Sequence, residues 1–255
     1  MQLSGNTILI TGGSAGIGLA FAAKFLELDN TVIVTGRKQD KLDAAKAAHP
    51  ALHTYQSDVA DPEQIASLAS RVAEEFPALN VLMNNAGIMV HRNLAEPTDD
   101  LAGLTREVDI NVGGSIRTTA AFIATLKANK GAIINVSSGL AFVPLTSAPI
   151  YCATKAAMHS YTTSLRFQLQ EADVEVIELM PPAVHTEMTG DIPEGGDFAI
   201  ITTDELVEAT VKALKSGSVE IRPGQSNQLH WMSRLAPGFI NGQLFKGSKS
   251  LIPEG

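Results

Sequence analysis

Cysteine, long apolar runs and an early basic residue are scarce or missing in this chain. Cys152 is the only cysteine, which excludes an intrachain disulfide and a metal site built from several thiolates. No apolar stretch approaches the roughly 18–20 residues that a membrane-spanning helix needs. The first basic residue is Lys24, so the chain lacks the charged start of a secretory signal. We therefore expect a cytoplasmic protein.

Positive charge and aromatic residues are also sparse. The formal net charge is −8, and aromatic residues make up 5% of the 255 residues. Binding to nucleic acid would need a basic stripe, and binding to a membrane surface would need a basic amphipathic helix. The sequence contains neither pattern. We expect no nucleic-acid partner and no membrane partner, and we attribute the acidity to a solvated surface.

What the chain does contain is a regular alternation of short β-branched apolar runs and longer helical patterns. Strands are predicted at 7–11, 31–35, 52–56, 81–83, 132–136 and 174–179. Helices are predicted at about 16–28, at 40–49, from 61 onwards, at about 101–127 and at about 151–171. Nearly continuous Val, Ile and Leu in the strands is typical of a parallel sheet covered on both faces. The sequence therefore predicts one α/β domain over residues 1–255, a doubly wound, Rossmann-like sheet in three layers.

One segment interrupts this alternation. Prolines and glycines are frequent between 181 and about 203, including Gly190, Pro193, Gly195 and Gly196. A connection of this length is usually a functional lid or a disordered excursion. We predict that residues 183–203 form a substrate loop, and a connection without function is the alternative.

A glycine-rich turn, Thr11–Gly18, joins the first predicted strand to the first predicted helix. Glycines allow the backbone to turn tightly and approach a ligand, and free N–H groups at a helix start attract a pyrophosphate. The spacing is G-x-x-x-G-x-G rather than the general dinucleotide fingerprint G-x-G-x-x-G. By itself the motif leaves an ordinary tight turn as the alternative.

Tyr151 and Lys155 open a predicted helix and, four residues apart, lie on one of its faces. A free phenol has a pKa of about 10, and a nearby positive charge lowers that pKa towards neutral pH. Such a pair is suited to proton transfer, although a surface pair is the alternative. Ser138 follows a predicted strand and precedes Tyr151 by thirteen residues.

These motifs together resemble the short-chain dehydrogenase/reductase family. Thr11–Gly18 matches the family turn T-G-x-x-x-G-x-G, Asn84–Gly87 matches its N-N-A-G motif, and Asp58–Val59 resembles its adenine-side acid. The resemblance implies a cofactor groove along these segments. Its expected members are Gly12, Ser14, Gly16, Ile17, Gly18, Asp58, Val59, Asn85, Ala86 and Gly87.

The resemblance also implies a catalytic tetrad. Tyr151 exchanges a proton with the substrate oxygen, and Ser138, at the family's separation, holds that oxygen in preference to Ser137. Lys155 lowers the pKa of Tyr151 and binds the nicotinamide ribose. Asn111 matches the helix asparagine that anchors a water for reprotonation of Lys155, and a structural amide is its alternative role. No metal is implied.

The choice of cofactor depends on the residues after the second strand. A carboxylate there would bind the ribose hydroxyls and repel a 2′-phosphate, but the chain has Gly36 and Arg37. The guanidinium of Arg37 suits a phosphate. This favours NADP(H). Ala15 stands where many NADP-preferring relatives have a basic residue, so NAD(H) remains the alternative.

Residues 181–186 match the family segment beside the nicotinamide. Pro181, Val184 and Thr186 are expected there, and Pro182 replaces the family's usual glycine. The Pro-Pro pair, together with the opening residues 3–8, resembles the DltE-like branch of the family. The resemblance further implies a homotetramer or homodimer and a segment at about 224–255 that closes the substrate cleft or forms an interface.

The predicted function is reversible NAD(P)H-dependent reduction of a small ketone or aldehyde, that is, a carbonyl reductase or alcohol dehydrogenase. Aryl or alkyl ketones are favoured because the loop contains Ile192, Phe198, Ile200 and Ile201 and few cations. The alternatives are a 3-oxoacyl thioester reductase, a silent nucleotide-binding scaffold, and an S-adenosylmethionine methyltransferase. His185 is expected to be solvated. His159 and Cys152 are expected to be packed residues without a chemical role.

Overall fold

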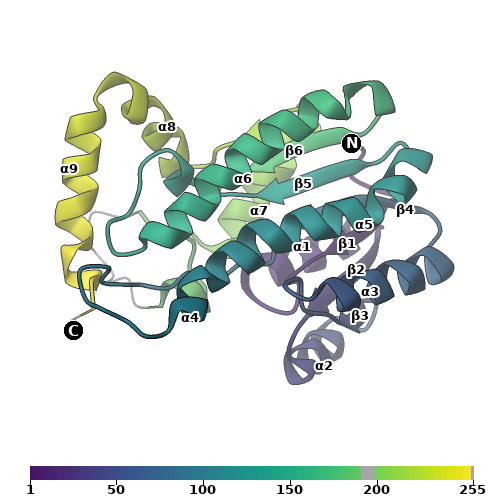
Figure 1. Cartoon of the computed structure of the whole chain (residues 1–255). Helices are drawn as coiled ribbons and strands as arrows, with labels where there is room; N and C mark the ends of the chain where they lie inside the picture. The colour runs from purple at the N-terminus through teal and green to yellow at the C-terminus, as the bar shows by residue number, and fades with distance from the viewer. Residues whose placement is uncertain (191–198, 254–255) are drawn as a thin grey trace.

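A single parallel sheet forms the centre of the molecule (Figure 1). The structure is a computed structural model, and it describes residues 1–190 and 199–253. The sheet has seven strands in the order β3-β2-β1-β4-β5-β6-β7. Their bounds are β1 Thr7–Ile10, β2 Thr31–Gly36, β3 His53–Gln56, β4 Leu79–Asn84, β5 Ala132–Val136, β6 Glu175–Leu179 and β7 Glu220–Ile221. The first six agree with the predicted strands, and the two-residue β7 is one that the sequence pattern did not indicate.

Helices cover both faces of the sheet, which confirms the predicted doubly wound α/β fold (Figure 1). The helices in the first half are α1 Gly16–Glu27, α2 Gln39–Ala48, α3 Pro62–Glu75, α4 Leu101–Glu107 and α5 Ser115–Ala128. The later ones are α6 Pro149–Gln168, α7 Thr203–Lys215, α8 Gln225–Leu235 and α9 Pro237–Ser248. Short 3₁₀ turns lie at η2 Gly139–Ala141, η3 Gln170–Ala172, η4 Glu187–Thr189 and η5 Lys249–Leu251.

Alternation along the strands divides the core into two layers. In β1, Ile8 and Ile10 point to the face covered by α1 and α7, whereas Leu9 points to the face covered by α3, α5 and α6. Successive side chains of a strand leave opposite faces, so a strand buried on both sides must be apolar throughout. The first layer contains Phe21 and Phe25 of α1, and the second contains Phe122 of α5.

The predicted helix at 101–127 is helical but not uniform. Residues Val108–Gly114 form a π-helical segment, η1, between α4 and α5. Gly114 lies where a Cβ atom would approach within 2.8 Å of the Val59 Cβ atom, so this turn packs closely on the chain after β3. Such π segments occur frequently at functional sites.

The predicted substrate loop is only partly within the described residues. Val184 forms a parallel bridge with Ile201, and η4 follows Thr186. Ile192, Pro193, Gly195, Gly196 and Phe198 lie outside the described residues. Helix α7 then starts with a capping box between Thr202 and Glu205.

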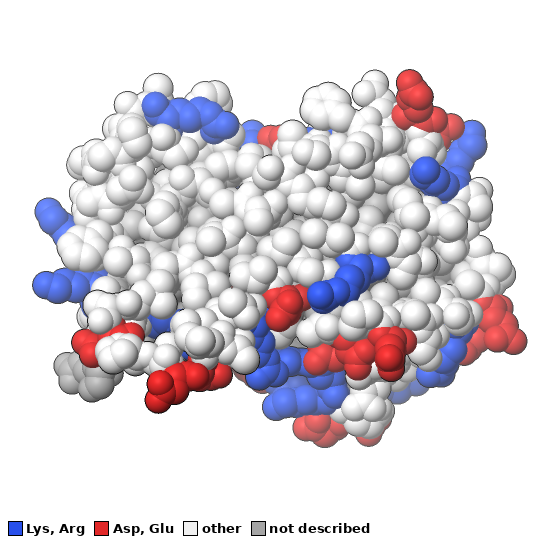
Figure 2. Space-filling model, viewed as in Figure 1, with Lys and Arg blue, Asp and Glu red and all other residues white. Residues whose placement is uncertain are grey.

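Helices α8 and α9 lie to one side of the sheet, beyond the carboxyl ends of β5 and β6 (Figure 1). The face that carries α5 and α6 is mostly uncharged, and charged side chains gather towards its edges (Figure 2). Within residues 1–190 and 199–253, no helix has the length and apolar character needed to cross a membrane.

Candidate active site

A cavity of about 450 Å³ runs along the carboxyl ends of the strands. In a parallel sheet this edge, beside the point where the strand order reverses between β1 and β4, is where ligands bind. All the residues that the sequence assigns to the cofactor line this cavity, except Gly18. The lining members are Gly12, Ser14, Gly16, Ile17, Arg37, Asp58, Val59, Asn85, Ala86, Gly87, Tyr151, Lys155, Pro181, Val184 and Thr186.

The glycine-rich turn has the backbone that glycine permits. Gly12 has φ +65° and Gly16 has φ +53°. A Cβ atom on Gly12 would lie 2.9 Å from the Cα atom of Ala86, so the two loops touch through their backbones. Helix α1 begins at Gly16, and among the described residues no side chain caps its N-terminus. The free N–H groups there suit an anionic ligand.

Gly18 has a different part from the one expected. It lies behind the turn, where a Cβ atom would come within 2.5 Å of Gly12 O and Asn85 Nδ2. Because Gly18 has no side chain, α1 can pack against the turn at this position. Gly18 therefore supports the turn and does not line the cavity.

Thr11 and Asn85 hold the two loops together. The Thr11 hydroxyl oxygen accepts hydrogen bonds from the backbone N–H groups of Asn85 and Ala86, both at 3.1 Å. The Asn85 side-chain amide donates to Thr11 O at 3.0 Å and to Gly12 O at 3.1 Å. The side chains of Thr11 and Asn85 are thus engaged in holding the two loops together. The backbone of the turn faces the cavity.

The end of the cavity near β2 is basic. Arg37 and Lys38 are exposed, and Lys41 at the start of α2 lines the same end. Lysines and arginines also gather near α2 at the lower edge of the space-filling view (Figure 2). No motif in the sequence indicated that Lys38 and Lys41 lie at this end of the cavity. Lys41 forms an ion pair with Glu187 at 2.6 Å, which joins α2 to the segment after Thr186.

The other end of the cavity brings Ser138 and Tyr151 together. Tyr151 is half-buried at the start of α6, and its hydroxyl shares a hydrogen bond with the Ser138 side chain. Burial raises the pKa of Tyr151, and the bond with Ser138 lowers it by a smaller amount. Ser138 Oγ also accepts from the Leu140 N–H at 3.1 Å.

Lys155 lies one helical turn after Tyr151 and is buried. Its Nζ atom donates to Val136 O at 2.9 Å and lies 5.4 Å from the centre of the Tyr151 ring. Burial lowers the pKa of Lys155 to about 8. Desolvation of the phenol outweighs the groups around it, so the net pKa of Tyr151 is raised. The role of Lys155 in lowering that pKa stays a prediction.

The side chains of Ser137 and Asn111 are both engaged in hydrogen bonds within the protein. Ser137 Oγ donates to Glu178 Oε1 at 2.5 Å. The Asn111 amide donates to Ile88 O at 2.9 Å and to Thr154 Oγ1 at 3.0 Å, and its oxygen accepts from the Ile88 N–H at 2.9 Å. Asn111 thereby fastens the segment after β4 to α6.

A second cavity of about 320 Å³ adjoins the first. The two cavities share Ser138, Tyr151, Pro181, Pro182, Met188 and Thr189. Its other walls are largely apolar, with Leu145, Leu229, Ile240 and Leu244 among them, and no described lining residue is charged. Gln225 of α8 and Gln243 of α9 add amide groups to this lining. The sequence does not indicate them, because helical spacing does not tell which face of a helix meets the cavity.

The segment expected to close the cleft or form an interface has residues of both kinds. Trp231 is 53% exposed and Leu235 is 77% exposed, whereas Leu229 lines the second cavity. A role of this segment in a subunit contact stays a prediction.

Two residues expected to be merely packed differ from one another. Cys152 is buried beside Leu145, and burial raises the pKa of its thiol to about 11. His159 forms an ion pair with Glu178 at 2.9 Å and is therefore part of a polar network rather than only packed. Among residues 1–190 and 199–253, no cluster of three or more His, Cys, Asp or Glu side chains could hold a metal ion.

Comparisons with known proteins agree on one family. A model described as short chain dehydrogenase matches residues 6–196. The chain is 43% identical over 224 residues to the uncharacterized oxidoreductase DltE of Bacillus subtilis (strain 168), covering 87% of this chain and 89% of that protein. A short-chain dehydrogenase from Burkholderia cenocepacia J2315 in complex with NADP has a TM-score of 0.84 at 29% identity, covering 96% of this chain and 99% of that one. A short-chain dehydrogenase from Sphingobium yanoikuyae in complex with NADPH has a TM-score of 0.79 at 27% identity, covering 93% and 94%.

Proposed function

This chain belongs to the short-chain dehydrogenase/reductase family, in its DltE-like branch, and from that premise we propose that it is a carbonyl reductase that uses NADP(H). The observation that carries this proposal is the meeting of two cavities at Ser138 and Tyr151. One cavity has the glycine-rich turn and the basic end that suit a dinucleotide. The other is an apolar space with no charged group among its described lining residues.

The residues present fit a nicotinamide dinucleotide. The backbone cradle at Gly12 would be filled by a Cβ atom, and the uncapped start of α1 suits a pyrophosphate. Arg37, Lys38 and Lys41 suit a 2′-phosphate, which favours NADP(H) over NAD(H). Pro181, Val184 and Thr186 would hold the nicotinamide. When bound, this group supplies the hydride.

Proton transfer belongs to the chain's own residues. Tyr151 gives its hydroxyl proton to the substrate oxygen during reduction, and Ser138 donates a hydrogen bond to the same oxygen. The ammonium of Lys155 stabilises the phenolate that remains. The side-chain amide of Asn111 links Ile88 to α6. The water-binding role that the family resemblance implies for Asn111 is part of the proposal.

The substrate is a small uncharged ketone or aldehyde with an apolar body. An unpaired charge would be desolvated in the second cavity without a partner, which is costly. Neutral aryl and alkyl ketones avoid that cost. A 3-oxoacyl thioester on a long phosphorylated carrier is less well suited, because the cavity walls offer it no cation among the described residues.

The assembly is a homodimer or homotetramer. The apolar side chains of Ile116 on α5 and Phe167 on α6 are 40% and 72% exposed. Those of Trp231 and Leu235 on α8 form a second exposed apolar group. Two such surfaces are what a tetramer with two kinds of contact would cover.

The proposal is tested with a panel of aryl ketones, alkyl ketones and aldehydes, following the absorbance of NADPH and NADH. We expect NADPH-dependent reduction that Tyr151→Phe lowers by several orders of magnitude while NADPH binding stays nearly intact. Removal of the proton donor affects the transition state and not the bound cofactor.

Tyr161→Phe is the matched control. Tyr161 lies on the same helix and is partly buried in the core layer that contains Phe122. It lines neither cavity. It should retain wild-type turnover. Substantial turnover in Tyr151→Phe would remove Tyr151 as the proton donor, and binding of S-adenosylmethionine instead of a nicotinamide would overturn the assignment.

A further inference from the structure

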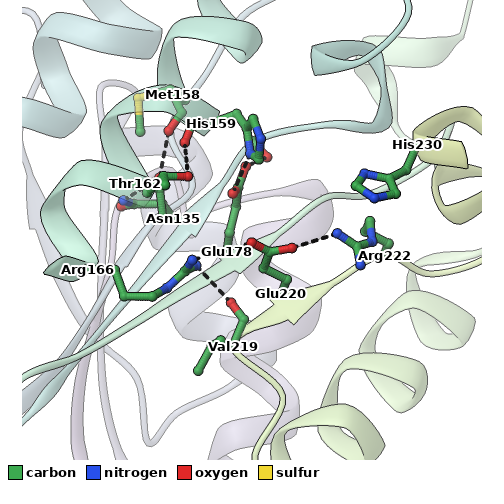
Figure 3. A network of polar contacts seen from close by, with 12 residues as sticks. Asn135, Met158, His159, Thr162, Arg166, Glu178, Val219, Glu220, Arg222 and His230 are labelled. Carbon is green, nitrogen blue, oxygen red and sulfur yellow. Dashed lines mark hydrogen bonds and ion pairs between the residues drawn. The ribbon is translucent and has the colours of Figure 1, made fainter. Parts of the chain in front are cut away.

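A fully buried carboxylate lies beside the proposed active site and has no part in the mechanism above. Glu178 is on β6 and its side chain has no exposed area. Oε1 accepts the hydrogen bond from Ser137 Oγ at 2.5 Å, and Oε2 bonds His159 Nδ1 at 2.9 Å. Figure 3 shows Glu178 and His159 pointing towards one another from β6 and α6.

Three consecutive residues at the end of β5 connect this carboxylate to the reacting groups. The carbonyl of Val136 accepts from Lys155, the hydroxyl of Ser137 donates to Glu178, and the side chain of Ser138 bonds Tyr151. A shift of any one of the three residues would move the groups held by the other two.

Pairing between the strands reinforces this arrangement. Glu178 lies opposite Asn135 in the β5–β6 ladder, and the Ser137 N–H donates to Leu179 O at 2.9 Å. Glu178 therefore holds the β5 end from the neighbouring strand through a side chain as well as through the backbone.

Stability alone does not account for a carboxylate in this position. A buried ion pair is often no more stabilising than apolar residues of similar volume, because desolvation offsets the attraction. Its usual benefit is a fixed geometry or a fixed local charge. Here both would act on Val136–Ser138 and on the buried ammonium of Lys155.

We propose that Glu178, held by His159 and Ser137, is a positioning residue for proton transfer: it fixes the end of β5 and places a negative charge near Lys155, which lies one turn before His159 on α6. This rests on the proposed function, because it concerns the same site. Glu178 touches neither cavity's reacting end and acts through Ser137 and Lys155.

The charges around this network are consistent with an electrostatic influence of Glu178 on Lys155. Burial lowers the pKa of Lys155, and Glu178 opposes that change by raising it. Glu220 of β7 is engaged elsewhere, with Arg222 at 2.6 Å and Arg166 at 3.4 Å. Figure 3 shows the contact between Glu220 and Arg222.

The remaining charged neighbours face His159. Hydrogen bonding to Glu178 raises the pKa of His159, Glu220 raises it further, and Arg234 of α8 lowers it. The ring of Phe142 separates His159 from His230, with ring centres 5.2 Å and 4.7 Å away. The pKa of His230 is lowered by burial and by Arg222 and Arg234, so His230 adds little positive charge near neutral pH.

The test measures the pKa of Lys155 directly and does not depend on turnover. Protein labelled with ¹³C-lysine is titrated by NMR, and the Lys155 signal is identified by its loss in Lys155→Met. Glu178→Gln keeps the volume and can still accept from Ser137, but it removes the charge. We expect the pKa of Lys155 to fall by roughly one unit.

Two further variants separate charge from loosening of the fold. Glu175→Gln makes the same change on the same strand at its far end, where Glu175 pairs with the N-terminus, and should leave the Lys155 pKa unchanged. His159→Gln keeps the Glu178 charge and removes its cationic partner, so the Lys155 pKa should hold or rise. An unchanged Lys155 pKa in Glu178→Gln, or a fall in both the Glu178 and His159 variants, overturns the proposal.

Turnover supplies a second readout. In Glu178→Gln, the pH at which NADPH-dependent reduction declines should move lower by the same amount as the Lys155 pKa, with little change in NADPH affinity. Absence of turnover in the wild-type protein would refute the proposed function, and the NMR titration would still decide whether the charge of Glu178 acts on Lys155.

Discussion

Burial keeps Tyr151 in its protonated form. Removal of the phenol from water raises its pKa, and the bond to Ser138 offsets only part of that rise. The same burial lowers the pKa of Lys155 to about 8. A phenol that remains protonated at neutral pH is ready to donate, which is what reduction of a carbonyl requires.

Arg37 is the residue expected to distinguish the two cofactors. We predict that Arg37→Leu weakens NADPH binding by about tenfold, since a hydrogen bond to a charged group contributes roughly 1.5–3 kcal/mol and Lys38 and Lys41 remain. NADH binding should change little. Titration of both cofactors by fluorescence measures this. Arg71→Leu, on α3 and outside the cavity lining, is the control. Equal losses for both cofactors would show that Arg37 does not bind the phosphate.

Gly12 provides a test of the backbone cradle. Gly12→Ala should destabilise the protein and abolish NADPH binding, because the residue has φ +65° and the new methyl group would meet Ala86. Gly5→Ala is the matched control, with φ +72° and open space around it. It should cost only about 1–2 kcal/mol from the left-handed backbone. Thermal unfolding and NADPH titration compare the two, and equal behaviour would remove the close contact as the cause.

Among the secondary-structure elements, the π-helical segment within the long helix is the one that most affects the site. It carries Asn111, whose amide bonds both backbone groups of Ile88 and the hydroxyl of Thr154. The segment after β4 therefore has a fixed course beside α6. The sequence predicts a helix here because the apolar pattern continues, but the local change in helix type has no compositional signal.

Asn111→Ala should lower the free energy of unfolding by about 2 kcal/mol, because it leaves the N–H and C=O groups of Ile88 without their partner. Urea denaturation measures this loss. Thr154→Val removes only one of the three bonds and should cost about 1 kcal/mol. A loss in Asn111→Ala no larger than that of Thr154→Val would contradict the bracing role.

On the scale of the whole molecule, exposed apolar side chains occur on the α5 and α6 face and on α8 and α9, among other places. The α5 and α6 face is largely uncharged in Figure 2, and α8 and α9 carry Trp231, Leu235 and Phe239, each more than half exposed. Apolar area of this kind on a soluble domain commonly marks an interface.

We predict that Phe167→Glu and Leu235→Glu each lower the assembly state and that the two together give a monomer. A buried charge without a partner opposes association. Sedimentation velocity measures the masses. Leu94→Glu, which alters another exposed leucine in the segment between β4 and α4, should leave the assembly unchanged. A wild-type monomer would refute the proposed homo-oligomer.

The sequence by itself determined the fold class and indicated the residues of the candidate site. Continuous apolar strands alternating with helices specify a parallel sheet, because only a strand buried on both faces tolerates such a composition. The turn at residues 11–18 and the spacing of Tyr151 and Lys155 each correspond to a local backbone geometry. Both could therefore be predicted from the sequence alone. The basic character of the cavity end at Arg37 could be predicted in the same way, because it depends on residues that follow one strand.

Tertiary structure decided which side chains meet across distant segments. Sequence spacing could not reveal that Glu178 holds Ser137 and His159, that Gly18 lies behind the turn, or that α8 and α9 wall the second cavity. It also could not give the sign of the pKa change at Tyr151, since desolvation depends on everything packed around the phenol. A local sequence pattern depends only on residues that are neighbours along the chain. Burial and long-range contacts arise only when the chain has folded.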